Sequence, residues 1–413
     1  MLACFLLAAA TGAGMRFSLL HGMPWDLTWT NVRHAHAHLL FFSWATPALM
    51  ILTLAAVGRS GAGRTVAWAA VALGAGSYLP FLLSGYTMTP VAGRALPLSM
   101  IFSGLSGLAW IAFAGTWTRG RLREGRPGER RPGERRDDPR GHGSAAVARH
   151  AIDLAVFVLL VSFVGALGLA AIGMTGSGSA RWMPALVAFY LDLFGEGWFA
   201  LALLGVAVAG LRPVADGRGR ALFGTGLDLL ALGLLVRSLA GLALDGTGAH
   251  GTAWVPWAEA ARFAGGVAAG AGLAWTAGAL LTAALRSPAG RTWILPLAFL
   301  AAKGAFDVAR AVPDVHAWTE AQGLRIVLLH AYLLGGITLG LLAAARQRWG
   351  LPGASRGTEA GVLALLAGLI PMTGLWPAAW AGPWALPAAA WTSLAPIVAV
   401  LGVVVASVLV RRA

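Results

Sequence analysis

Long apolar stretches, separated by short polar connections, dominate the chain. A helix that crosses a bilayer needs about 20 mostly apolar residues. The sequence contains twelve such stretches, roughly at 1–20, 34–57, 66–84, 96–116, 150–175, 183–211, 220–243, 257–285, 292–312, 324–346, 358–377 and 385–410. Because an open strand cannot satisfy its backbone in lipid, each stretch is expected to be helical. The pattern predicts an all-α, polytopic transmembrane helix bundle of about 12 spans, forming a single integral membrane domain over residues 1–413.

The composition supports this class and excludes others. Apolar residues make up 58% of the 413 positions and charged residues only 12%, whereas a soluble domain carries about 25% charged residues. A soluble globular protein, a disordered chain and a nucleic-acid-binding domain are therefore excluded, despite the net charge of +14. The lipid bilayer is the expected partner. The single cysteine, Cys4, excludes a disulfide framework and a cysteine-based metal cluster.

The basic residues predict the orientation of the spans. Of the 31 Lys and Arg residues, 22 lie in connections after even-numbered stretches or at the C-terminus, and four lie in connections after odd-numbered stretches. Cytoplasmic loops of membrane proteins carry an excess of Lys and Arg. Both termini are therefore predicted to be cytoplasmic.

The longest connection, residues 117–149, has a distinct composition. It is rich in Arg, Gly, Glu and Pro and contains the near-repeat GRPGERRPGERRDD. Such a segment is too polar to insert in a membrane and too rich in Pro and Gly for a stable helix. We predict a disordered basic cytoplasmic loop, with contact to anionic lipid as the functional alternative.

Three histidines open the second stretch, in the sequence NVRHAHAHLLFFSW. His34 and His38 are four residues apart and share one face of a helix, whereas His36 points largely elsewhere. The predicted orientation places all three near the outer surface. For a single interfacial histidine, the simpler reading is a hydrogen bond to a neighbour or to water.

Other candidate ligands fall at a similar depth. Asp192 and Glu196 lie four apart in the sixth stretch, His250 follows the seventh, and His330 begins the tenth. Neutral imidazole is the commonest ligand of metals and of heme iron, and two histidines from different helices can hold one heme. A histidine with two carboxylates suits non-heme iron or a similar metal. The convergence predicts an outer-side metal or heme site.

A second polar cluster lies in the ninth stretch. Lys303 and Asp307 are four residues apart, so an internal ion pair is the simpler interpretation. A path for protons or anions is the alternative, because ionisable residues inside a membrane are costly and mark functional sites.

The chain resembles, as a distant relative, the catalytic subunit of the heme-copper oxidases and nitric oxide reductases, which has ligands in the second, sixth, seventh and tenth spans. The nearest likeness is to the nitric oxide reductase branch. In LDLFGEGW, Asp192 stands where that branch has a metal-ligand histidine, and Glu196 stands where it has a glutamate. GTGAHGTAW retains the family's glycines and His250, with Ala249 at the position of a first histidine.

This resemblance implies a heme b held by the second and tenth spans. His36 is the best match to the low-spin heme ligand, because Ser43-Trp44 falls where the family has a small residue and an aromatic. A shifted alignment would make His34 or His38 the heme ligand instead, and this alternative stays open. His330 matches either the first or the second histidine of the family's His-x-His pattern.

The resemblance also implies a second site. Asp192, Glu196 and His250 would hold non-heme iron or copper or pass protons, with Glu196 as the candidate catalytic residue. Lys303 and Asp307 are the candidate proton path. Two of the three histidines that the family has at its non-heme metal are missing, so the resemblance leaves open whether the protein is an oxidoreductase.

We therefore hypothesise a heme protein of a prokaryotic plasma membrane, acting in electron transfer or in redox chemistry on a small gas. Its electron donor would be another protein or a quinol, because the chain has no Cys-x-x-Cys-His motif. One alternative is a non-catalytic protein on the same scaffold, such as a transporter, a metal- or heme-handling protein or an assembly protein. Another is a structural partner subunit or a homo-oligomer.

Overall fold

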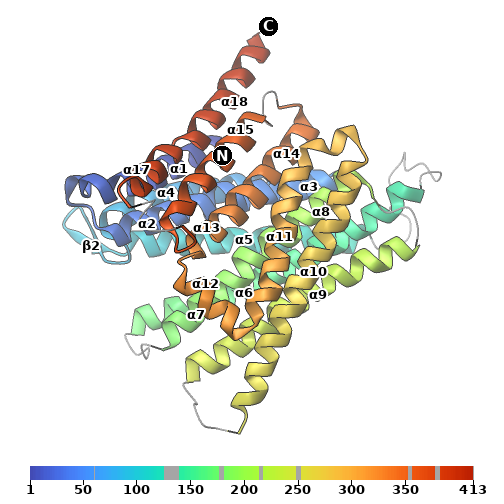
Figure 1. The fold of residues 1–413 in the computed structure, drawn as a ribbon, viewed down its shortest axis with the longest axis horizontal. Helices are drawn as coiled ribbons and strands as arrows, with labels where there is room; N and C mark the ends of the chain where they lie inside the picture. Colours follow the sequence, from blue (N-terminus) through green and yellow to red (C-terminus); the bar gives the residue numbers. More distant parts are fainter. Residues whose placement is uncertain are drawn as a thin grey trace. The chain divides into compact units, whose positions relative to one another are not determined.

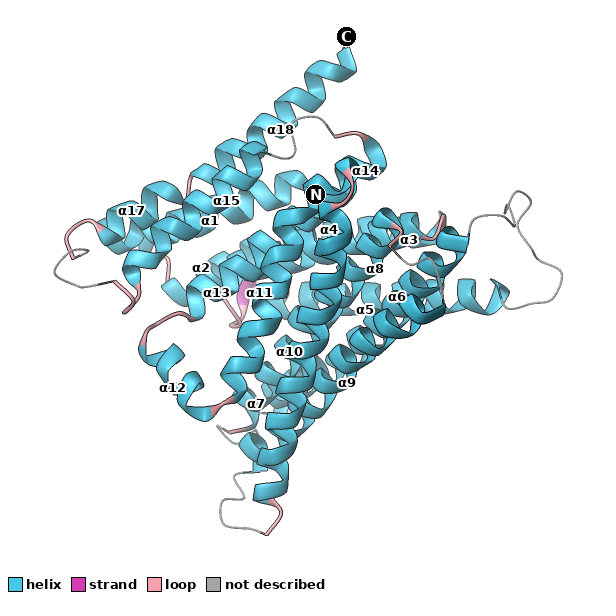
Figure 2. Ribbon diagram, turned by 45° about the vertical axis from the view of Figure 1, so that its right-hand side comes forward, coloured by secondary structure: helices cyan, strands magenta, loops and turns pink. Residues whose placement is uncertain are grey.

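The computed structural model describes residues 1–59, 61–124, 139–175, 181–213, 217–247, 253–351, 356–376 and 382–412. Within these residues the protein is almost entirely helical (Figure 1). Its one sheet there is the hairpin of β1 (Thr89–Val91) and β2 (Arg94–Leu96), which Figure 2 distinguishes from the surrounding helices.

The helices follow one another with short connections. The first part of the chain forms α1 (Leu2–His21), η1 (Pro24–Asp26), α2 (Trp29–His38), η2 (Leu39–Ala45), α3 (Thr46–Ala56), α4 (Ala62–Ser84), α5 (Leu98–Glu124), α6 (Pro139–Thr175), α7 (Trp182–Leu191), η3 (Asp192–Trp198) and α8 (Phe199–Leu211). The remainder forms α9 (Gly217–Thr247), α10 (Val255–Leu285), η4 (Pro288–Trp293), α11 (Ile294–Ala311), α12 (Pro313–Ala321), α13 (Arg325–His330), η5 (Ala331–Thr338), α14 (Leu339–Trp349), α15 (Arg356–Leu369), η6 (Ile370–Met372), α17 (Ala385–Thr392) and α18 (Ala395–Arg412).

Eleven helical segments in the described residues are long and apolar enough to cross a membrane. They match every predicted stretch except 358–377, where the shorter helix α15 and the single turn η6 form instead. The prediction of an all-α, multi-pass membrane protein is therefore confirmed.

The chain divides into two compact units. Unit 1 comprises Met1–Leu52, Ser60–Phe113 and Trp318–Ala413, and it includes α1, α2, α4, the β-hairpin and the helices from α13 onward. Unit 2 comprises Thr53–Arg59 and Ala114–Ala317, and it includes α6 to α11. The two groups of candidate residues lie in different units.

Helix reaches further into the segment 117–149 than the sequence predicted. Residues 117–124 belong to α5, residues 139–149 belong to α6, and only 125–138 lie outside the described residues. Tertiary contacts explain the extension. The Trp117 indole donates to Asp153 at 2.7 Å, Arg121 pairs with the same carboxylate at 3.0 Å, and the Arg59 guanidinium lies 4.6 Å from the Trp117 ring centroid.

Three membrane-crossing segments contain π-helical turns. These turns are η2, η3 and η5, and they follow His38, begin at Asp192 and follow His330, respectively. The same three segments are the most buried, with 78%, 83% and 61% of their apolar windows buried, against 44% for the next. π-turns shift the helical register and occur frequently at functional sites. His38, Asp192 and His330 therefore lie at or next to irregular turns in the most buried of these segments.

In unit 2, glycines bring three helices into backbone contact. A Cβ added at Gly272 of α10 would lie 2.5 Å from the Gly226 carbonyl oxygen and from the Leu230 nitrogen of α9. One added at Gly270 would lie 2.7 Å from the Gly304 carbonyl oxygen of α11. Small residues at such contacts let helices in a membrane pack closely. This packing fixes α9 and α11 on opposite sides of α10.

The substitution Gly272→Val is expected to destabilise the protein by about 1–3 kcal/mol, because a side chain there must push the α9 backbone away. Gly278→Val is the matched control on the same helix, since a Cβ at Gly278 meets nothing within 4 Å. Thermal unfolding in detergent measures both variants. Equal losses of stability in the two would show that helix propensity, and not close packing, is responsible.

Candidate functional site

The three histidines of α2 contact two different parts of unit 1: His34 and His38 contact Tyr86, and His36 contacts α1. The His34 ring packs edge-on against Tyr86 with centroids 4.8 Å apart, and His38 Nε2 lies 3.1 Å from the Tyr86 hydroxyl. His36 instead donates from Nδ1 to the carbonyl oxygen of Ala8 on α1, at 2.7 Å. The helical geometry predicted from the spacing, with His36 on a separate face, is confirmed.

His38 has both ring nitrogens and one ring face in contact with protein groups. Besides Tyr86, its Nδ1 lies 3.4 Å from Ser103 Oγ, and its ring stacks on Phe81 with centroids 3.9 Å apart. Gly85 ends α4 with φ 59°, a left-handed conformation that turns the chain and allows Tyr86 to fold back. Desolvation raises the pKa of the Tyr86 hydroxyl, which therefore stays protonated. His38 is held as a packing and hydrogen-bonding residue.

The His36 ring lies against α1 at a point where α1 has no side chain. A Cβ built on Gly12 would lie 2.8 Å from His36 Cε1, so a larger residue there would displace the imidazole. Because Nδ1 donates to a carbonyl, Nε2 carries the lone pair. Within the described residues, the structure gives this Nε2 no hydrogen bond.

His330, at the end of α13, is held in the same manner. Its Nδ1 lies 2.7 Å from the Ile326 carbonyl oxygen, so the proton is on Nδ1 and Nε2 is an acceptor. Arg16 of α1 donates to that Nε2 at 2.9 Å, and its other terminal nitrogen donates to the Gly12 carbonyl oxygen at 3.0 Å. Arg16 therefore occupies the nitrogen that a metal would take.

Unit 1 thus brings two predicted ligands to one turn of α1. Gly12 contacts His36, and Arg16, four residues later, contacts His330. A metal-ligating histidine typically donates its other ring N–H to a carbonyl or a carboxylate, which fixes the tautomer. Both imidazoles meet this requirement through backbone carbonyls. The donor chemistry of the pair fits a heme iron.

The π-turns η2 and η5 are joined directly in unit 1. The Trp44 indole of η2 donates to Thr338 Oγ1 of η5 across 3.3 Å in the buried interior. The Trp44 ring also packs on Phe5 of α1, with centroids 5.4 Å apart. These contacts connect the helices that carry His36 and His330 to the helix that lies against both.

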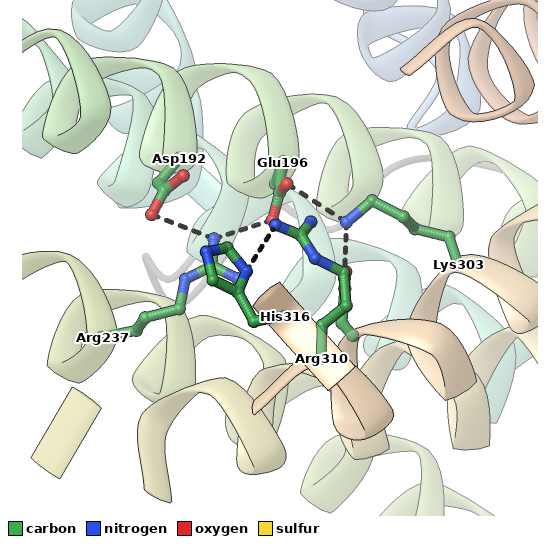
Figure 3. A network of polar contacts seen from close by, with 7 residues as sticks. Asp192, Glu196, Arg237, Lys303, Arg310 and His316 are labelled. Carbon is green, nitrogen blue, oxygen red and sulfur yellow. Dashed lines mark hydrogen bonds and ion pairs between the residues drawn. The ribbon is translucent and has the colours of Figure 1, made fainter. Parts of the chain in front are cut away.

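Unit 2 holds the second group of candidate residues as an ionic network (Figure 3). The carboxylates of Asp192 and Glu196 share the Arg237 guanidinium of α9, at 3.1 and 2.7 Å. Lys303 of α11 contacts Glu196 at 3.1 Å and Asp307 at 2.5 Å. The predicted ion pair of Lys303 with Asp307 is therefore present, as part of a larger chain of charges.

The carboxylate oxygens of Asp192 and Glu196, which the sequence predicted to bind a metal, contact cations of the protein instead. One Glu196 oxygen accepts from Arg237 and the other from Lys303. His250 lies outside the described residues. Among the described residues, no group of three or more His, Cys, Asp or Glu side chains is arranged to hold a metal ion. A metal at Asp192 and Glu196 would have to displace both cations, so this arrangement does not fit a metal site.

Sequence reasoning missed two partners in these clusters. Neither Arg16 nor Arg237 has a role in the sequence-based hypotheses, although both lie within apolar stretches. That location was the available signal, because a charge within a membrane requires a partner. Asp228, which also lies within an apolar stretch, pairs with His150 at 2.8 Å.

Replacing Arg237 by Met is expected to destabilise the protein by about 1–3 kcal/mol, because it leaves two half-buried acidic side chains without their shared cation. The combined variant Arg237→Met with Asp192→Asn and Glu196→Gln should recover much of this loss. Arg262→Met is the control, since Arg262 is exposed and its oxygen partner on Asp245 is 3.6 Å away. Unfolding in detergent measures all three. Equal stability of the Arg237 and Arg262 variants would refute a structural role for the network.

Neither a scan against models of protein families nor a search of curated proteins finds a match to the chain. Its chemistry is therefore inferred from two clusters. Unit 1 provides two imidazoles whose Nε2 atoms carry lone pairs, beside a guanidinium. Unit 2 provides a hydrogen-bonded chain of acidic and basic side chains.

Proposed function

We propose that the protein is an integral membrane heme protein in which His36 and His330 hold a b-type heme. One observation carries the proposal: two imidazoles from helices far apart in sequence meet at one turn of α1, each with Nδ1 fixed by a backbone carbonyl. Their tautomers suit ligation through Nε2. His38 is less suitable, because both of its nitrogens contact protein hydroxyls.

The heme would supply one-electron chemistry, and with an open iron position it would also bind small gases. In this proposal the protein resembles the catalytic subunit of heme-copper oxidases and nitric oxide reductases. Its role is electron transfer or redox chemistry on a small gas. The electron donor is another protein or a quinol. The carbonyls of Ala8 and Ile326 orient the ligand histidines.

We assign the unit 2 network a role in holding and moving protons. A continuous chain of polar contacts, each between 2.5 and 3.1 Å, joins Asp192, Arg237, Glu196, Lys303 and Asp307. Chains of this kind serve as proton relays inside membranes. Glu196 is the central member, because it contacts both cations.

The same network favours a second candidate function, a transporter on this scaffold. It joins η3, α9 and α11, which belong to three membrane-crossing segments, and transporters place charged residues at such positions. The presence of heme iron in the purified protein discriminates between the two functions.

An optical spectrum tests the heme proposal. The purified protein should show a Soret band and contain iron, and His36→Ala and His330→Ala should each abolish the six-coordinate spectrum by removing a ligand. His34→Ala on the same helix is the control and should leave the spectrum intact. A shift on adding CO would identify an open heme, whereas an unshifted bis-histidine spectrum would indicate electron transfer alone. Absence of both the Soret band and iron would refute the proposal.

We further propose twelve spans, of which α15 and η6 would together form the eleventh, with both termini cytoplasmic in a prokaryotic plasma membrane. The asymmetric distribution of arginine supports this orientation. In this arrangement the connection before α10 is outside the cell, and the connection between α10 and α11 is inside.

Cysteine labelling tests the orientation. In a Cys4→Ser background, Trp257→Cys should react with a membrane-impermeant maleimide in intact cells, because Trp257 is 78% exposed near the start of α10. Ala289→Cys, at an exposed position between α10 and α11, should react only after the membrane is permeabilised. The reverse pattern would invert the topology.

A further inference from the structure

We infer that Arg16 is an anion-binding residue that pairs with a carboxylate group of the tetrapyrrole held by His36 and His330. The inference rests on the proposed function and adds to it, because it specifies that the bound group must carry a carboxylate on the side of α1. Three properties of Arg16 support this role: its position, its partners and its permanent charge.

Arg16 differs from Arg237 and Lys303, two other cations within membrane-crossing helices. Arg237 and Lys303 contact carboxylates at 2.7 and 3.1 Å. In the part of the chain that the structure describes, Arg16 contacts only the Gly12 carbonyl and the His330 imidazole, and both are neutral acceptors. An arginine remains protonated under all ordinary conditions. Its positive charge therefore lies inside an apolar helix without an acidic partner in the described residues.

Placing such a charge in a membrane costs free energy. Arg16 also has N–H groups beyond the two that donate to Gly12 and His330. A guanidinium carries five N–H groups, and the structure assigns two of them, one to Gly12 and one to His330. Charged side chains within membranes mark sites where a counter-ion or substrate binds. A planar guanidinium matches a carboxylate in geometry and can donate to both of its oxygens. A carboxylate of a bound ligand would supply the acidic partner that the described residues do not provide.

The contact with His330 links the anion to the heme site. Arg16 donates to Nε2 of His330, which is the atom that would ligate iron. Ligation removes that acceptor, so the guanidinium loses one of its two partners at the moment when the ligand arrives. A carboxylate on the ligand replaces the lost acceptor. Arg16 thus contacts the Nε2 atom of His330 in this structure, and it would pair with the carboxylate of the tetrapyrrole once iron takes that nitrogen.

Binding of heme and of heme dimethyl ester to full-length protein, prepared without heme in detergent, tests this inference. The ester keeps the iron and the ring but has no carboxylate. Wild-type protein should bind heme at least about tenfold more tightly than the ester, since one charge-assisted hydrogen bond contributes this much affinity. Absorbance titration gives both dissociation constants.

Substitution of Arg16 should reverse this preference in a defined direction. Arg16→Gln is expected to weaken heme binding by about tenfold while leaving ester binding unchanged or tighter, because it also removes the competitor for His330 Nε2. Arg16→Lys should restore part of the preference. Arg33→Gln is the control, because it removes an equal charge from an exposed position on α2, three residues before His36. If Arg16→Gln does not fold, the comparison of heme with its ester on the wild type decides alone.

The outcomes separate the two proposals. Equal affinity of the wild type for heme and ester would overturn the role of Arg16 and leave the heme site standing. Failure to bind either compound would overturn the heme site itself. Acetate and nitrite are added in a parallel titration of the ester complex. Saturable binding of either anion that depends on Arg16, without a preference for heme over its ester, would assign the site to a free anion and overturn pairing with the tetrapyrrole.

Discussion

The cost of placing a polar or charged group in lipid governs the arrangement of this protein. Because no water is available within the hydrocarbon, each such group must find its partner inside the protein. The ionic network of unit 2 follows from this constraint: three acidic side chains and two basic side chains from separate helices form one chain of contacts. The histidines of unit 1 follow it as well, because backbone carbonyls hold the Nδ1 atoms of His36 and His330.

Irregular helix and close packing allow these partners to meet. π-turns follow His38 and His330 and begin at Asp192, in the three most buried segments. A π-turn offsets the side chains that follow it and leaves backbone groups outside the regular ladder, and it persists where surrounding protein compensates. Glycines provide the close packing. Gly12 leaves room for the His36 ring, and Gly272 lets α10 contact the α9 backbone.

The two clusters differ in what they leave unsatisfied. In unit 2, the carboxylates of Asp192, Glu196 and Asp307 each contact a cation of the chain. In unit 1, Nε2 of His36 has no hydrogen bond in the described residues, and Arg16 contacts only neutral acceptors. A site with lone pairs and a surplus positive charge is suited to an external ligand that carries both a metal and an anionic group. For this reason the proposed heme is placed in unit 1 and the proposed proton handling in unit 2.

Local patterns in the sequence were enough to predict the all-α class, eleven of the helical spans and the separate faces of His34, His36 and His38, because apolar stretch length and the helical repeat are local properties. It also predicted the pair of Lys303 and Asp307, which are one turn apart. Three features became evident only in the fold: Arg237 joins Asp192 to Glu196, Arg16 contacts His330, and helix continues through residues 117–124. These contacts join helices distant in sequence, and their geometry depends on how closely the helices pack, which no local pattern encodes.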